Sequence, residues 1–504
     1  MCNKQMDESR AKPFIRLRGI SKSFGGVQAL KNVDLDLYPG EVHALAGENG
    51  CGKSTLIKIL SGVYEADSGT IEINGEQYKK MTPIESVRLG VQIIYQDFSI
   101  FPNLTVRENI ALSSEIMTNR KLVNQARITE IADSAIKKMN LDLDPDIRVE
   151  QLSVADKQLV ALTRAIHHNA KLVVMDEPTS ALTYKEVLRL FDVIHELRKE
   201  GIAVVLVSHK IDEVFHISQK YTILRNGMHI ATGAVAELTR DKFTYYMTGR
   251  ELRFTTMDRQ VKEDTIMQVK NLGKKGYFSD INFTLNRGEM LAITGFLGSG
   301  RTELAQAIFG MTPADEGTIT IDGQDVVIKS VDDALKYGIG YIPEDRLTEG
   351  LFMRRPIMDN AIITNIDSHT NKLGVIDQHA AETEGATWMK AMRLNTEKYE
   401  RPVATLSGGN QQKVILARWL ATEPKIFILN SPTAGVDIGA KFDLHAILRE
   451  LSESGMSIIM ISDDIPEVLA CSDRIMVMRD GRFISELVTR ETSEEKINQI
   501  LYTV

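Results

Sequence analysis

The sequence has little cysteine, little tryptophan and no excess of positive charge. Its 504 residues include three cysteines, Cys2, Cys51 and Cys471, which are too few and too scattered for a disulfide framework or a zinc site. Lysine and arginine number 60 against 68 aspartates and glutamates, so bulk charge does not attract the chain to nucleic acid. No apolar run approaches the roughly 18 residues of a membrane-spanning helix, and the polar start MCNKQMDESRAKPF has no apolar h-region, so we expect a chain that is neither secreted nor membrane-spanning by itself.

An internal repeat covers most of the sequence. GEVHALAGENGCGKST (residues 40–55) is matched by GEMLAITGFLGSGRTE (residues 288–303), and DSGTIEING by DEGTITIDG, both 248 residues apart. The spacing grows to 254 for later pairs such as VVMDEPT and FILNSPT, so the second copy carries six extra residues. The sequence therefore predicts two domains, residues 1–250 and 251–504.

Each copy has the pattern of an α/β domain. Short apolar runs such as KLVVM (171–175) and AVVLV (203–207) end at polar positions and alternate with amphipathic stretches, which predicts buried parallel strands with crossover helices. GTIEING and GTITIDG alternate before an Asn-Gly or Asp-Gly turn, which is typical of antiparallel hairpins. We expect a mainly parallel sheet with an antiparallel β edge, and a helical subdomain at about residues 100–150 of the first copy.

The first copy carries a phosphate-binding loop. GENGCGKST fits G-x-x-x-x-G-K-[ST] between an apolar strand and a helical segment, where glycines let backbone N–H groups surround phosphate and the helix dipole favours an anion. We expect Lys53 to reach the β- and γ-phosphate oxygens and the Ser54 hydroxyl to ligate Mg²⁺. The residues expected to bind nucleotide are Gly47, Glu48, Asn49, Gly50, Cys51, Gly52, Lys53, Ser54 and Thr55.

Cys51 lies in this loop beside Lys53 at a helix start, a setting that lowers the pKa of a thiol. Alkylation is then expected to block nucleotide hydrolysis, and ATP is expected to protect the thiol. The alternative is that Cys51 only fills space.

An acidic pair follows a later strand. KLVVMDEPTSAL carries Asp176 and Glu177 to the carboxyl edge of the sheet, where α/β proteins hold ligands. Asp176 is placed to hold Mg²⁺ through water, and Glu177 to polarise the attacking water as general base. His209, Gln96 and Phe24 are weak signals when taken singly.

The ordered set of motifs resembles the ATP-binding cassette superfamily. It consists of a P-loop, YQD, LS-x-x-x-x-Q, MDEPTSAL and SH, and it is duplicated. The tandem arrangement, with LSVA in one half and GRTE, PEDR and LSGGNQQK in the other, more narrowly resembles ATP-binding subunits of carbohydrate importers of the ribose, galactose, xylose and autoinducer-2 type. The resemblance implies an ATP hydrolase at the cytoplasmic face of the cell membrane, peripheral to a pair of permease subunits that an extracytoplasmic solute-binding protein supplies. Nucleic acid is not an expected partner, and the solute is not readable from the sequence.

The resemblance also assigns residue roles. Two cassettes would pack head to tail, with each ATP between one P-loop and the signature segment of the other half. Gln96 would contact Mg²⁺ or the attacking water, His209 the γ-phosphate, and Phe24 the adenine face. The catalytic set would be Lys53, Gln96, Glu177 and His209; Ser54, Gln96 and Asp176 would hold the metal; and Ser407, Gly408 and Gly409 of LSGGN would complete the site.

The second site differs from the first at five positions. In place of Lys53, Gln96, Asp176, Glu177 and His209 it has Arg301, Glu344, Asn430, Ser431 and Asp463. Arg301, Glu344 and Asp463 are usual in the second half of the family that the sequence resembles, whereas Asn430 and Ser431 replace an acidic pair that relatives commonly retain. An amide lacks the charge that holds Mg²⁺, and a serine cannot replace a carboxylate base. We expect residues 295–302 to bind nucleotide with little hydrolysis, and the alternative is a second half that only dimerises. A soluble tandem-cassette ATPase acting on ribosomes is the rival function, although such proteins usually keep both acidic pairs and have a long charged linker.

Overall fold

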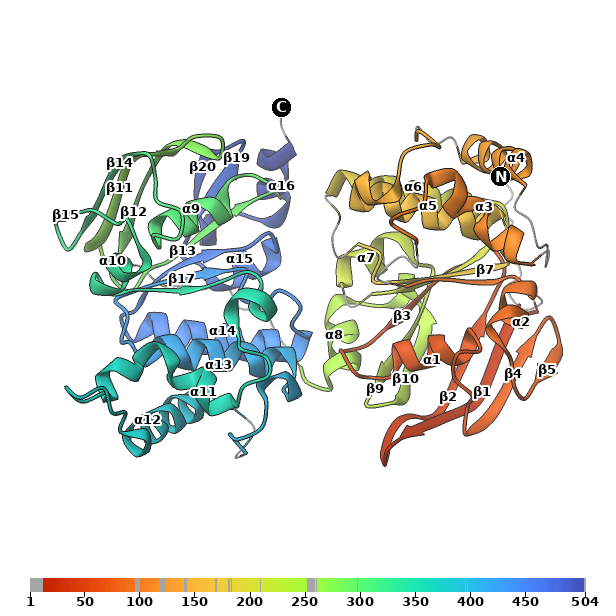
Figure 1. Cartoon of the computed structure of the whole chain (residues 1–504), viewed down its shortest axis with the longest axis horizontal. Helices are drawn as coiled ribbons and strands as arrows, with labels where there is room; N and C mark the ends of the chain where they lie inside the picture. Colours follow the sequence, from red (N-terminus) through yellow and green to blue (C-terminus); the bar gives the residue numbers. More distant parts are fainter. Residues whose placement is uncertain are drawn as a thin grey trace. The chain divides into compact units, whose positions relative to one another are not determined.

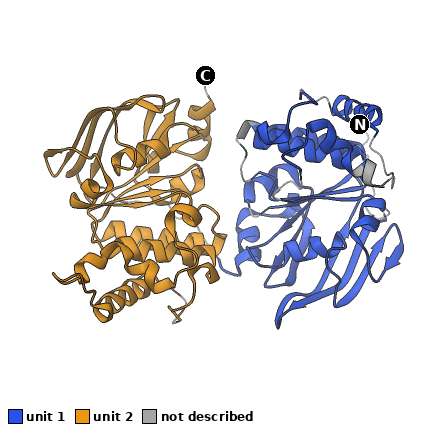
Figure 2. Cartoon of the chain, viewed as in Figure 1, with its two compact units in different colours: residues 1–252 blue, residues 253–504 orange. Residues whose placement is uncertain are grey.

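The computed structural model divides into two compact units, residues 1–252 and 253–504 (Figure 2). No helix in the described part of the chain is long and apolar enough to cross a lipid bilayer. The structure describes residues 12–95, 100–117, 124–139, 143–167, 170–179, 182, 184–208, 210–251, 259, 261–296, 298–394, 396 and 398–502.

Buried parallel strands form the centre of the first unit. β3 (Val42–Ala46) pairs with β8 (Ala203–Val207) and β9 (Lys220–Arg225), and β7 (Leu172–Asp176) pairs with β8 and with β6 (Val91–Ile94), all in parallel. Parallel strands need crossover connections, usually helical. The helices that follow these strands or cross between them are α1 (Lys53–Leu60), α5 (Val154–His167), α6 (Tyr184–Lys199) and α7 (Ile211–Ile217).

An antiparallel edge and a helical subdomain complete the first unit. β1 (Ile15–Phe24) pairs with β2 (Val27–Leu37) and β4 (Ser68–Ile73), and the predicted GTIEING hairpin is β4 with β5 (Glu76–Tyr78). The helical subdomain packs α3 (Val106–Met117) and α4 (Gln125–Lys138) on α5 through buried side chains such as Ile110, Ala132 and Val160. The further elements of the first unit are α2 (Pro83–Arg88), β10 (Met228–Ala234) and α8 (Arg240–Thr248).

The second unit repeats this plan. Its described strands form a six-stranded sheet in the order β16-β17-β18-β13-β19-β20 and a four-stranded antiparallel sheet in the order β12-β11-β14-β15. Figure 1 shows α11, α12 and α13 gathered together below the parallel strands, as a helical subdomain. The predicted fold class, α/β with an antiparallel edge in each copy, is confirmed.

The elements of the second unit keep the chain order of the first. The strands are β11 (Thr265–Lys274), β12 (Phe278–Asn286), β13 (Met290–Gly295), β14 (Glu316–Ile321), β15 (Gln324–Val326), β16 (Ile339–Ile342), β17 (Ile426–Asn430), β18 (Ser457–Ile461), β19 (Arg474–Arg479) and β20 (Arg482–Val488). The helices are α9 (Arg301–Ile308), α10 (Val331–Lys336), α11 (Ile357–Ile362), α12 (Gln378–Ala391), α13 (Gly408–Leu420), α14 (Ile438–Glu453), α15 (Ile465–Cys471) and α16 (Glu494–Tyr502).

The first hairpin differs in length between the units. In the first unit the pair Lys22 and Leu30 is followed by a longer arm that ends at Phe24, whereas in the second unit Lys274 pairs with Phe278 across a turn of three residues. The second hairpin is therefore four residues shorter, which matches the sequence, where Leu272 to Phe278 is aligned with the longer stretch from Ile20 to Leu30. It has no strand position equivalent to Phe24.

Candidate nucleotide-binding site

The loop between β3 and α1 has a backbone that only glycine adopts easily. Gly47, Gly50 and Gly52 have φ values of 153°, 77° and 107°, in the region that L side chains avoid. A Cβ at Gly47 would collide with the carbonyl oxygen of Leu224, and one at Gly52 would lie 2.6 Å from the carbonyl oxygen of Ala29. The glycines therefore let the loop turn tightly against the neighbouring strands and expose its N–H groups to an anion.

Lys53 is folded back over this loop. Its side chain is 5% exposed, and Nζ donates hydrogen bonds to the carbonyl oxygens of Gly47 at 2.6 Å and Glu48 at 3.0 Å. A buried ammonium must have such acceptors. The same Nζ is thus held where phosphate oxygens could replace the carbonyl oxygens, as expected for a P-loop lysine.

Cys51 does not have the low pKa that its sequence position suggests. The side chain is 4% exposed and packs in the apolar core. Burial raises the pKa of the Cys51 thiol, and the nearby charge of Lys53 only partly opposes that shift. The prediction of a lowered thiol pKa is therefore wrong, because burial of the thiol outweighs the nearby charge of Lys53.

The folded protein is expected to react slowly with N-ethylmaleimide at Cys51. The raised pKa lowers the fraction of thiolate, and the buried thiol is shielded from the reagent, so the rate should be well below that of free cysteine at the same pH. Peptide mass spectrometry would follow the labelling, with urea-unfolded protein as the fast control. Equal rates in folded and unfolded protein would contradict the buried position.

Asp176 and Ser54 meet at the carboxyl edge of the sheet. Asp176 is the last residue of β7, in register with Val207 of β8, and accepts a hydrogen bond from the Ser54 hydroxyl. Burial and the adjacent charge of Glu177 raise the pKa of Asp176, while Lys53 opposes the shift. A hydroxyl beside a carboxylate with excess negative charge is an oxygen donor set that fits Mg²⁺.

Glu177 is presented by a strained turn. Its φ is 49°, uncommon for a residue with a side chain, and its N–H donates to the carbonyl oxygen of Val207 at 3.0 Å. Ser431 of the second unit also has a φ of 49°, and its N–H donates to Ile461 at 2.8 Å. The second unit therefore keeps the backbone of the acidic pair without its carboxylates.

Phe24 is an exposed aromatic at the end of β1. Its side chain is 41% exposed, and its ring meets that of Tyr64 edge to face with 5.1 Å between centroids. The sequence did not single out Tyr64, which lies beyond α1 in the chain. Gln96 and His209 lie outside the described residues.

The LSGGN segment begins α13 of the second unit. Ser407 is the N-cap of this helix, without a side-chain capping bond. A Cβ at Gly408 would lie 2.8 Å from Nη2 of Arg346, and a Cβ at Gly409 would collide with Ala440. Gly409 therefore needs glycine for packing. The two glycines carry no side chains at the helix N-terminus, so an anion can approach it closely.

A buried glutamate that the sequence prediction missed supports the loop after β8. Glu213 accepts hydrogen bonds from Ser208 at 2.8 Å and from Thr179. Glu467 does the same in the second unit with Ser462 and Thr433. Glu213 and Glu467 are 254 residues apart, the same spacing as the other late pairs of repeated motifs. That spacing could have identified them as equivalent residues from the sequence.

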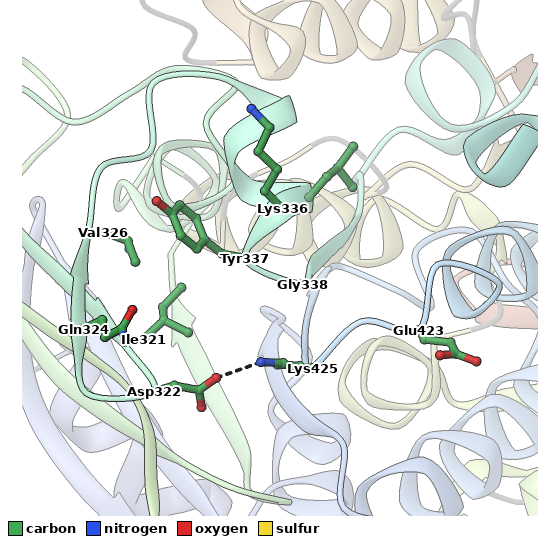
Figure 3. A pocket seen from close by; sticks show the side chains of 10 residues that line it. Ile321, Asp322, Gln324, Val326, Lys336, Tyr337, Gly338, Glu423 and Lys425 are labelled. Atoms are coloured by element: carbon green, nitrogen blue, oxygen red, sulfur yellow. Dashed lines mark hydrogen bonds and ion pairs between the residues drawn. The ribbon is translucent and has the colours of Figure 1, made fainter. Parts of the chain in front are cut away.

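A hollow in the second unit lies away from these residues. It has a volume of about 340 Å³, and Lys425 Nζ is 2.8 Å from the Asp322 carboxylate at its rim (Figure 3). Gly338 and Lys425 of its lining directly precede β16 and β17. The hollow is thus at the amino ends of parallel strands, whereas the P-loop and acidic pair follow carboxyl ends.

Comparisons with known proteins agree with this geometry. The ABC transporter family model matches residues 30–180 and 278–434. The ribose import ATP-binding protein RbsA of Clostridium perfringens is 41% identical over 492 residues, which are 97% of this chain and 98% of that protein. Ribose import ATP-binding protein RbsA 1 of Streptomyces coelicolor is 39% identical over 486 residues, 96% of each chain.

A structural comparison adds information on the fold alone. A model of ribosome-bound archaeal Pelota and ABCE1 matches 98% of this chain and 81% of that chain with a TM-score of 0.63 at 20% identity.

The chain belongs to the ABC transporter family. Within that family it is an ATP hydrolase with two cassette matches in one polypeptide. The predicted family and enzyme class are confirmed.

Proposed function

We propose that this chain hydrolyses ATP to energise the import of a sugar or sugar-like solute through a separate permease. The observation that carries the proposal is identity of about 40% over nearly the whole chain with ribose import ATP-binding proteins. The ribosomal alternative has no comparable support, because the ribosome-bound relative is 20% identical and shares the fold only.

We assign hydrolysis to the first P-loop and its acidic pair. Lys53 binds the β- and γ-phosphates, Ser54, Asp176 and Gln96 hold Mg²⁺, and Glu177 accepts a proton from the attacking water. When bound, Mg²⁺ neutralises charge on the phosphates. The contact of Phe24 with adenine, that of His209 with the γ-phosphate, and completion of the site by Ser407, Gly408 and Gly409 rest on the sequence resemblance.

Coupling of ATP hydrolysis to transport requires a partner protein. ATP binding and hydrolysis shift the chain between two conformations, and a partner that binds one conformation more tightly than the other receives the free energy of that shift. We propose that this partner is a pair of permease subunits, fed by an extracytoplasmic solute-binding protein, so that the chain is peripheral at the cytoplasmic face of the cell membrane.

The test is affinity purification of the tagged full-length chain from detergent-solubilised membranes, with mass spectrometry of the bound proteins. A multi-spanning permease recovered with the chain is the expected result. Recovery only from the soluble fraction, together with ribosomes, would overturn the import proposal and leave the ATPase.

The second site is expected to regain hydrolysis when its carboxylates are restored. In a Glu177→Gln background, Asn430→Asp with Ser431→Glu should raise residual phosphate release at least about tenfold, because the turn at Ser431 already has the backbone of the turn at Glu177 and a general base contributes about 10²- to 10⁴-fold. Asn430→Asp alone is the control. Unchanged turnover in the double variant would contradict the idea that the second site has lost only its catalytic carboxylates.

A further inference from the structure

Arg346 joins three segments of the second unit that lie far apart in the chain. It stands shortly after the end of β16, and its guanidinium donates hydrogen bonds to the carbonyl oxygens of Ala434 and, at 3.1 Å, of Gly435. Its Nε donates to Oε1 of Gln411 on α13 at 3.2 Å. One side chain therefore connects the segment after β16, the turn after β17 and the first turns of the LSGGN helix.

Gln411 extends this connection to the LSGGN segment. Gln411 is 5% exposed, and its Nε2 donates to the carbonyl oxygen of Leu406, the residue before Ser407, at 3.2 Å. Its backbone N–H donates to the carbonyl oxygen of Ser407 at 2.9 Å. Nη2 of Arg346 also lies 2.8 Å from the point that a Cβ on Gly408 would occupy. The guanidinium and the amide together therefore fix the backbone that presents Ser407 and Gly408.

The bonds of Arg346 depend on the shape of a guanidinium. Its acceptors are two carbonyl oxygens and one amide oxygen. Burial lowers the pKa of Arg346, a shift that the neighbouring charge of Asp345 opposes, so the three acceptors surround a partly desolvated cation. A planar guanidinium donates in several fixed directions at once, whereas an ammonium group on a flexible stem does not reproduce that fork. The three segments therefore keep one mutual arrangement while these bonds last.

The sequence of the first unit excludes the same connection. At the positions of Arg346 and Gln411 it has Phe98 and Lys157, and a phenyl ring carries no hydrogen-bond donor. Lys157 donates instead to the carbonyl oxygen of Glu150 at 3.4 Å. The connection thus accompanies the LSGGN segment, which is proposed to complete the intact first site. It does not accompany the LSVAD segment, which would complete the altered second site.

We infer that Arg346 is a positioning residue for ATP hydrolysis at the first P-loop. It acts through Gln411 and holds the LSGGN segment against the turn after β17. The inference rests on the proposed function in that LSGGN completes the first site. Because the P-loop that binds the nucleotide belongs to the other unit, loss of Arg346 should reduce turnover and leave that loop intact. A displacement of about 1 Å in a positioning group can lower a rate by about 10²-fold.

The test compares ATP hydrolysis by the full-length chain with that of three variants, Arg346→Ala, Arg346→Lys and Gln411→Ala. Arg346→Ala should lower kcat by about 10- to 100-fold, while the affinity for a fluorescent ADP analogue stays nearly constant. Arg346→Lys should lose activity to a similar extent, because lysine keeps the charge but not the fork of donors. In the double variant Arg346→Ala with Gln411→Ala, kcat should fall no further than in Arg346→Ala alone, because the two side chains act as a unit.

Arg393→Ala is the matched control, because it removes an equal charge from the same unit. Arg393 forms an exposed ion pair with Glu450 at 2.7 Å, so its loss should leave kcat nearly unchanged. Hydrogen exchange separates positioning from folding, because in Arg346→Ala faster exchange should be confined to peptides around residues 403–411 and 431–436, with β13 and β18 still protected.

Full activity in Arg346→Lys, a further fall in the double variant, or faster exchange throughout the second unit would each overturn the inference. Absence of ATP hydrolysis in the unaltered chain would overturn both this inference and the assignment of the first site. Recovery of the chain with ribosomes in place of a permease would overturn the import proposal alone.

Discussion

Replacing Glu177 by glutamine is expected to lower kcat for ATP hydrolysis by about 10²- to 10⁴-fold while ATP still binds. Glutamine keeps the size of the side chain and the hydrogen bond from the backbone to Val207, but it cannot accept a proton from water at neutral pH. Because Lys53 and the P-loop are untouched, the change should fall on kcat and leave nucleotide affinity nearly constant. Phosphate release and binding of a fluorescent ATP analogue would separate the two quantities.

The repeat supplies a control at the equivalent position. Ser431 has the same φ of 49° as Glu177 and a matching backbone hydrogen bond, so Ser431→Ala disturbs a comparable turn without removing a carboxylate. It should leave turnover nearly unchanged. If Glu177→Gln kept more than about a tenth of the activity, Glu177 would not be the general base.

Replacing Glu467 by alanine is expected to destabilise the second unit by about 3–5 kcal/mol, the usual cost of removing one partner from a buried charged network. Glu467 is 1% exposed and accepts hydrogen bonds from Thr433 at 2.7 Å, His445 at 2.9 Å and Ser462 at 2.5 Å. Truncation would leave the buried His445 and the partly buried Lys441 without this carboxylate.

The same network should show in the acid range. Burial by itself would raise the pKa of Glu467, but the charge of Lys441 and the bonds from His445 and Ser462 bring it down from 4.5 to about 2. Since the folded pKa lies below the unfolded one, the stabilisation is complete above pH 4.5 and is lost as the pH falls from about 4.5 toward 2. Glu467→Ala should lack this part of the acid dependence.

Hydrogen exchange of peptides from each unit is the suitable measurement, because a two-unit chain need not unfold in one step. Glu213→Ala in the first unit is the control. Glu213 accepts comparable hydroxyl bonds, but its cation, Lys210 at 3.2 Å, is half exposed, and Val187 and Phe191 occupy the positions of Lys441 and His445. The smaller loss should occur there; equal losses would show that Lys441 and His445 contribute little.

Local patterns predict the parts of this molecule that local forces determine. The P-loop glycines fix their own backbone, and the apolar runs that end at Asp176 and Val207 predict both the strands and the edge at which they meet. The short second hairpin follows from counting residues between repeats. These features need no knowledge of distant side chains.

Properties set by distant contacts could not be predicted in this way. The position of Cys51 beside Lys53 suggests a low thiol pKa, yet burial decides the direction of the pKa shift. That burial depends on strands that are far from Cys51 in the sequence. Glu467 obtains two of its partners, Thr433 and His445, from positions more than 20 residues earlier in the chain. The contact of Thr302 with Glu344 spans 42 residues, so a glutamate at that position gives no sign of its partner by itself.

The presence of both units in one polypeptide has a consequence for composition. Because residues 1–252 and 253–504 are translated together, every molecule contains one complete acidic pair and one altered pair in a fixed ratio. Were the units separate chains, the ratio of the two would vary with the expression of each. Fusion therefore keeps the two copies in equal number while their sequences diverge.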